Sequence, residues 1–88
     1  MTLAAWITQE LQNRLNPAEL TVVDESEQHR GHAGWREGGE THFRIHIVSA
    51  AFAGKSRVER HRLVNEALGG AFARGLHALA IQAKAPGE

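Results

Sequence analysis

Histidine is the residue type in this chain whose chemistry is most informative. The sequence contains six histidines and no cysteine. Neutral imidazole binds zinc, copper and iron, whereas a disulfide, a thiol nucleophile or a thiolate metal site requires cysteine. A thiolate metal site could therefore form only with sulfur ligands from another molecule. The six residues are His29, His32, His42, His46, His61 and His77.

Three of these histidines lie in or beside a polar, glycine-containing segment over residues 25–39. Two residues separate His29 from His32, and His42 follows the far end of the segment. The three could share one zinc ion, but without carboxylate or thiolate support the site would be loose. A solvated loop explains the same residues. The local pattern alone gives structural or solvated positions to His46, His61 and His77.

A second candidate site is a group of basic side chains at an expected helix start: Lys55, Arg57, Arg60 and Arg62. Together with the exposed N–H groups of a helix N-terminus, such side chains could bind phosphates. A solvated helix start explains them too. Lys plus Arg equals Asp plus Glu at ten each, so the formal net charge is zero. Any binding to DNA should therefore be modest and strongly dependent on salt.

The composition argues against several functional classes. There is no cysteine and no tyrosine, and the pair Glu40 and His42 is too little for acid/base catalysis. No apolar run approaches the roughly 20 residues that cross a membrane, and residues 1–16 lack the features of a secretory signal. We expect a non-enzymatic, cytoplasmic protein without membrane contact, monomeric in isolation.

One small α+β domain over residues 1–88 is expected to position these side chains. Apolar residues recurring every four positions predict a helix over residues 3–15. Alternating apolar and polar residues predict strands over 19–24 and 41–49, joined as an antiparallel hairpin. In the second strand, Phe43, Ile45 and Ile47 share a buried face. His42 and Arg44 are expected on the wetter face.

The second half of the chain predicts a broken helix followed by a strand. Ser56 and Glu59 match the capping box that begins a helix, and Val64, Leu68 and Phe72 form its apolar stripe. The helix is expected to break near residues 69–70 and resume to residue 74, before a last strand over 76–84. The resulting architecture, αββααβ, is a three-stranded sheet with helices packed on one face.

Three segments in this order resemble the BolA family over almost the whole chain. They are residues 39–43 (GETHF), residues 52–58 (FAGKSRV) running into 60–64 (RHRLV), and residues 76–80 (LHALA). The resemblance implies a fold like the class II KH domain. It also implies two activities: sharing a [2Fe–2S] cluster with a monothiol glutaredoxin in iron homeostasis, and DNA-binding regulation of stress and morphology genes.

The resemblance also implies roles for individual residues. His77 matches the family's C-terminal cluster ligand, and the variable loop supplies a second ligand, for which His29, His32 and His42 are the candidates. A cluster ordinarily needs four ligands, so the thiolates would come from glutaredoxin and its bound glutathione. For nucleic acid, KH domains clamp the backbone with a G-x-x-G loop. Residues 54–57 (GKSR) lack the second glycine, which argues against clamping of single strands.

Overall fold

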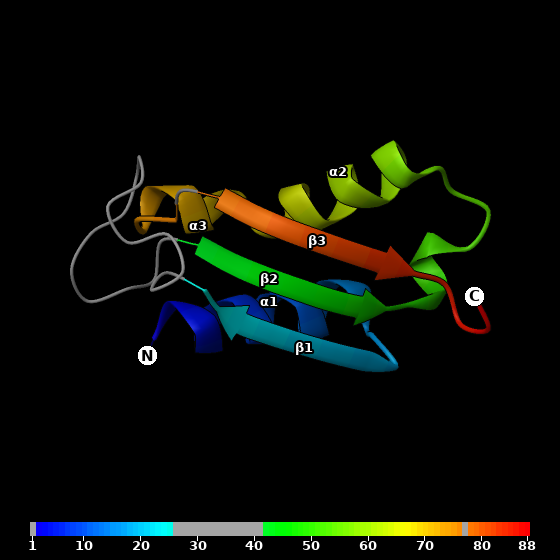
Figure 1. Cartoon of the computed structure of the whole chain (residues 1–88), viewed down its shortest axis with the longest axis horizontal. Coiled ribbons are helices and arrows are strands. Elements are labelled where there is room, and N and C mark those ends of the chain that lie inside the picture. The colour runs from blue at the N-terminus through cyan, green and yellow to red at the C-terminus, as the bar shows by residue number, and fades with distance from the viewer. Residues whose placement is uncertain (1, 26–41, 77) are drawn as a thin grey trace.

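The computed structural model of the protein describes residues 2–25, 42–76 and 78–88. It has a three-stranded sheet in the order β1-β2-β3 with helices covering one face (Figure 1). Strand β1 (Glu19–Asp24) pairs antiparallel with the central strand β2 (His42–Val48). Strand β3 (Ala78–Lys84) pairs parallel with β2. The expected α+β architecture is confirmed.

The first helix, α1 (Leu3–Leu15), has the predicted bounds. The Oγ1 of Thr2 accepts a hydrogen bond from the Ala5 N–H at 3.1 Å and so caps its N-terminus. Asn16 ends the helix in the left-handed conformation, with φ 43°. The following Pro17 disfavours helical geometry in the residue before it, so the local sequence sets this end.

The connection from β2 to β3 is a helical crossover, as parallel pairing requires. It contains the short 3-10 helix η2 (Ala50–Phe52), then α2 (Arg57–Ala67) and α3 (Gly69–Ala73). The capping box at Ser56 and Glu59 is formed. The break between α2 and α3 falls at Leu68, just before the predicted position, and η2 was not predicted.

The apolar core lies between the sheet and the helices. Its fully buried side chains come from α1, β2, η2 and the α2–α3 region, and include Ile7, Leu11, Phe43, Ile45, Ile47, Phe52, Val64 and Leu68. The predicted stripe is wrong at Phe72, whose side chain is 47% exposed, while Ala71 is buried. The break at Leu68 changes the phase of the helical repeat, so a spacing counted from α2 does not hold in α3.

Two strand ends and one strand face also differ from the prediction. Ser49 follows β2, where its hydroxyl donates to the Leu15 carbonyl and accepts from the Ala51 N–H. Leu76 is buried but precedes β3. His42 was expected on the wetter sheet face, yet only 6% of it is exposed. Alternation predicts which face a side chain takes, but not how well that face is covered at the strand end.

Candidate functional site

The ends of all three strands meet at one edge of the sheet, on the left in Figure 1. Parallel pairing sets His42, the first residue of β2, opposite Ala78, the first residue of β3. Antiparallel pairing brings Asp24, the last residue of β1, opposite Phe43. The Glu25 N–H then donates to the His42 carbonyl at 2.8 Å. We call this place the strand-end edge.

A small hollow of about 160 Å³ lies at the strand-end edge. Its lining residues come from β2, from β3 and from the position directly after β1: Glu25, His42, Phe43, Arg44, Ala78, Leu79 and Ala80. The Glu25 carboxylate accepts from Arg44 Nε at 3.0 Å, and its side chain is only 13% exposed. This ion pair ties the residue after β1 to β2 and helps to fix the hollow.

The other proposed metal ligands, His29, His32 and His77, lie outside the described residues. Along the chain, however, residues 26–41 join Glu25 to His42, and residue 77 directly precedes Ala78. Among the described residues, no three histidine or acidic side chains are grouped to hold a metal ion. The cluster ligands and the alternative zinc site therefore stay predictions.

The two histidines without a proposed ligand role have other surroundings. His46 Nδ1 lies 3.0 Å from Gln82 Oε1, so this pair bridges β2 and β3 on the sheet face away from the helices. His61 is half-buried in α2. Both positions agree with the structural or solvated roles expected from the sequence.

A larger hollow, of about 490 Å³, lies at the opposite end of β3, beside the start of α2. Its lining residues are mostly basic: Lys55, Arg57, Arg60, His61, Ile81, Gln82, Ala83 and Lys84. We call it the basic hollow. On β3 the basic hollow is lined by residues 81–84 and the smaller hollow by residues 78–80, so the two hollows share no residue, although their linings are consecutive along this strand.

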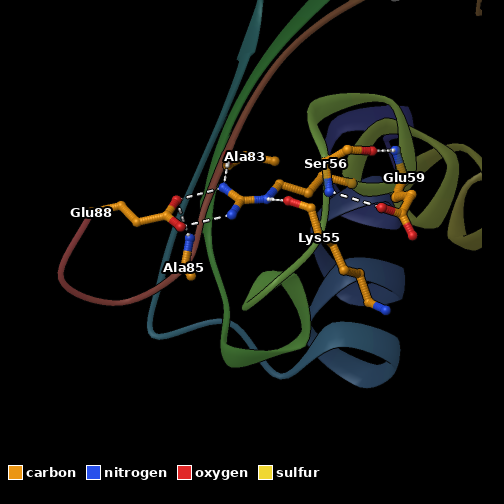
Figure 2. A network of polar contacts seen from close by, with 7 residues as sticks. Lys55, Ser56, Glu59, Ala83, Ala85 and Glu88 are labelled. Atoms are coloured by element: carbon orange, nitrogen blue, oxygen red, sulfur yellow. Dashed lines mark hydrogen bonds and ion pairs between the residues drawn. The ribbon is translucent and has the colours of Figure 1, made fainter.

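Arg60 differs from its basic neighbours because its guanidinium is bound on several sides. Its partners Lys55, Ala83 and Glu88 are labelled in Figure 2. Its Nε donates to the Lys55 carbonyl at 2.9 Å, and Nη1 donates to the Ala83 carbonyl at 3.2 Å. Nη1 and Nη2 also donate to the two carboxylate oxygens of Glu88, the second bond measuring 2.7 Å. Arg60 thus joins α2 to the segment after β3, and its contribution to nucleic-acid binding stays a prediction.

Glu88 was not identified from the sequence, since it is 28 residues from Arg60. Its carboxylate also accepts from the Ala85 N–H at 3.0 Å. The hydrogen bonds from Arg60, followed by that from Ala85, lower the pKa of Glu88 to about 2. In the sequence, the one hint of the contact between Glu88 and Arg60 is that an acidic residue follows closely after a strand that ends in Lys84.

The other three predicted cations, Lys55, Arg57 and Arg62, all have exposed side chains.

This ion pair predicts a specific loss of stability in acid. The pKa of Glu88 falls from 4.5 to about 2 on folding, so its contribution is present above pH 4.5 and disappears as the pH falls toward 2. Glu88→Gln should therefore lower stability at pH 6 and flatten its decline between these values. Denaturant unfolding at several pH values measures this. The control Glu66→Gln alters an exposed α2 carboxylate, and an equal effect there would contradict the prediction.

Comparison with known proteins places the chain in a family. The profile of the family described as BolA-like protein matches residues 11–88. The chain belongs to the BolA-like protein family. It superposes on the BolA domain of SufE1 from Arabidopsis thaliana with a TM-score of 0.87, at 48% identity over 98% of this chain and 94% of that one. For BolA1 from Mus musculus the TM-score is 0.81, at 46% identity over 98% and 67%.

Curated BolA-like relatives differ in length and in the names they carry. SufE-like protein 1, chloroplastic/mitochondrial, of Arabidopsis thaliana is 51% identical over 93% of this chain but only 23% of its own length. Protein BOLA1, chloroplastic, of the same plant is 47% identical over 97% of this chain and 54% of that protein. The DNA-binding transcriptional regulator BolA of Vibrio cholerae is 41% identical over 85% and 67%. This chain thus matches a domain that also occurs within longer proteins.

No helix among the described residues is long and apolar enough to cross a membrane. The names of the two Arabidopsis relatives place them in chloroplasts or mitochondria. A cytoplasmic location for this chain therefore stays a prediction.

Proposed function

We propose that this BolA-like chain shares a [2Fe–2S] cluster with a monothiol glutaredoxin and contributes two histidine ligands to it. The observation that carries the proposal is the meeting of three strand ends at one edge. His42 lies at this edge, and the segments holding His29, His32 and His77 join the described structure there. At this edge, ligands from distant parts of the sequence could be offered together to a partner.

The donor set fits a shared cluster better than a cluster held by this chain alone. A [2Fe–2S] cluster takes four ligands, which are thiolates in most proteins and include two imidazoles in Rieske centres. The chain has no cysteine, so glutaredoxin and glutathione would provide the thiolates. When bound, the cluster supplies electron transfer or iron–sulfur cargo, while the protein residues bind and orient it. This assigns the chain a non-enzymatic role.

Burial favours the loop histidines over His42 as the second ligand. Only 6% of His42 is exposed. A cluster on a partner could reach this ring only if neighbouring groups moved aside. We therefore propose His77 with either His29 or His32 as the ligand pair, and a structural role for His42.

Anaerobic reconstitution tests the proposal. The chain, a monothiol glutaredoxin, iron, sulfide and glutathione are combined, and the products are separated by size-exclusion chromatography. We expect a one-to-one heterodimer whose visible circular dichroism differs from that of the glutaredoxin homodimer, because imidazole would replace thiolate among the cluster ligands. Absence of a heterodimer, with the spectrum of the glutaredoxin homodimer alone, would overturn the proposal.

DNA binding through the basic hollow is the second proposed function. The Vibrio cholerae relative is named a DNA-binding transcriptional regulator, and the basic hollow of this chain has exposed Lys55 and Arg57 at its rim. The capping box holds the adjacent helix start, since Ser56 Oγ accepts from the Glu59 N–H at 3.1 Å. Cations at a fixed helix start suit contact with a phosphate backbone.

Charge reversal tests the second function. In Lys55→Glu with Arg57→Glu, duplex DNA should bind more weakly, and the slope of log affinity against log salt should fall by about 2 for two lost phosphate contacts. Fluorescence anisotropy at several salt concentrations measures both. Arg14→Glu with Arg74→Glu is the charge-matched control, since neither cation lines the hollow. Circular dichroism checks that this variant is folded, because Arg14 pairs with Glu10 and Arg74 lies over the Trp6 ring. Equal loss in the two double variants would show a general charge effect and argue against this site.

A further inference from the structure

The basic hollow contains an arginine that already binds an anionic group from the same chain. We propose that the hollow is a phosphate-binding site at Arg60, and that the Glu88 carboxylate occupies the arginine as an internal competitor. This inference deepens the second proposed function, because it names the ligand chemistry of that surface and a contact that restrains it. The phosphate could belong to a nucleic-acid backbone or to a free small phosphate.

The position of the Arg60 guanidinium does not depend on Glu88 alone. Its hydrogen bonds to the Lys55 and Ala83 carbonyls anchor it to the segment before α2 and to β3. The N–H groups that meet Glu88 form the two-pronged edge of the guanidinium. This edge matches carboxylate and phosphate equally well in bidentate geometry. If the carboxylate left, Arg60 would still present a fixed fork.

The surroundings of Arg60 favour an anion with more charge than a single carboxylate. Lys55, Arg57, His61 and Lys84 line the same hollow. Its volume of about 490 Å³ lies within the range of small-molecule sites, roughly 300–1,000 Å³. A phosphate group offers more acceptor oxygens than a carboxylate and could meet Lys55, Arg57 or Lys84 in addition to Arg60. Of the basic side chains that line the hollow, Glu88 accepts hydrogen bonds from Arg60 alone.

The contact of Glu88 is of a kind that can be exchanged. Glu88 lies beyond the end of β3 in a local turn, where its N–H donates to the Ala85 carbonyl at 3.2 Å. Its side chain is 43% exposed, against 13% for Arg60. Because the Glu88 carboxylate is open to water on one side, salt screens this ion pair and a competing anion can reach it. Release would require only residues 86–88 to move, while Ala85 stays in the core.

Binding of two phosphate probes to Glu88→Gln tests the proposal. Glutamine removes the competing charge but keeps an oxygen acceptor for the Ala85 N–H. The probes are a 20-base-pair DNA duplex, followed by anisotropy, and inorganic pyrophosphate, followed by NMR chemical shifts including the Arg60 Nε–Hε resonance. We expect Glu88→Gln to bind at least one probe about 5-fold or more tightly than the wild type, the lower end of typical coupling between sites.

Three further variants make the result specific. Glu66→Gln gives the same change in net charge from an exposed position at the other end of α2 and should change affinity little. Glu88→Ala removes any hydrogen bond that glutamine retains and should act like Glu88→Gln. Adding Arg60→Lys to Glu88→Gln keeps the charge but removes the fork, so the gain should disappear. Circular dichroism checks that each variant is folded.

The outcomes separate the phosphate sources and the two proposals. Tighter binding of DNA alone assigns a backbone phosphate, and tighter binding of pyrophosphate alone assigns a small phosphate. Unchanged affinity for both probes in folded Glu88 variants, or an equal gain in Glu66→Gln, overturns the internal competitor. If the wild type binds DNA and loses it on reversal of Lys55 and Arg57 while the Glu88 variants change nothing, the second function stands without this inference.

Discussion

Replacing His77 with alanine is expected to remove the heterodimer-specific spectrum of the reconstituted cluster. In the proposed function His77 is one of the two histidine ligands, and it directly precedes the strand that pairs with β2 at the strand-end edge. Without this imidazole the heterodimer lacks one of four ligands, while glutaredoxin can still assemble a cluster with thiolates alone. The visible circular dichroism should therefore revert to that of the glutaredoxin homodimer.

His46→Ala is the matched control for this experiment. His46 lies on the sheet face away from the helices, within hydrogen-bonding distance of Gln82, and no ligand role is proposed for it. Its loss should leave the cluster spectrum unchanged. A wild-type spectrum in folded His77→Ala would show that the resemblance assigns the wrong ligand. Equal loss in both variants would point to a general requirement for a folded sheet.

Single alanine variants of the loop histidines extend the same experiment. Either His29→Ala or His32→Ala should reproduce the effect of His77→Ala, and the other should not. His42→Ala should instead lower the stability of the free protein, because its side chain is almost fully buried. Loss of the spectrum in stable, folded His42→Ala would contradict the structural role proposed for His42 and make it the second ligand.

The periodic elements were predictable because short-range physics determines them. In α1, a capping threonine and a proline after the last turn set both ends. In β2, alternation placed Phe43, Ile45 and Ile47 on the buried face, and all three are buried. The capping box at Ser56 likewise depends only on a residue three positions away. In each case the deciding contacts lie within one turn or one strand.

The features that were not predicted depend on contacts between distant residues. The burial of His42 depends on which groups cover the start of β2. The alternation of apolar and polar residues along β2 carries no information about that cover. Glu88 meets Arg60 only because the crossover makes β3 parallel to β2 and returns the chain to the start of α2. The strand-end edge has the same origin, since the parallel register brings His42 opposite Ala78. Part of each candidate site is therefore a product of topology.

Phe52→Ala is expected to cause the largest loss of stability among the variants considered. Phe52 is fully buried in η2, between the end of β2 and the start of α2. Truncating a buried phenylalanine costs about 3–5 kcal/mol, through lost burial and the cavity that remains. Small domains have a total stability of about 5–15 kcal/mol, so much of the margin should disappear. Denaturant unfolding followed by circular dichroism measures the shift.

Phe72→Ala is the control, since the same substitution there removes a side chain that is 47% exposed. We expect a loss of roughly 1 kcal/mol, because full burial of a phenylalanine side chain contributes about 1.5–3 kcal/mol and Phe72 is only partly buried. Equal losses at the two sites would contradict the phase change that the break at Leu68 produces.

Residues 52–58, on which the family resemblance partly rests, include a core residue, Phe52, and two exposed cations, Lys55 and Arg57. If Phe52 acts only through packing, Phe52→Ala should reduce glutaredoxin or DNA binding in proportion to the fraction of the protein that is unfolded. Lys55→Glu with Arg57→Glu should instead reduce DNA binding while the protein stays fully folded.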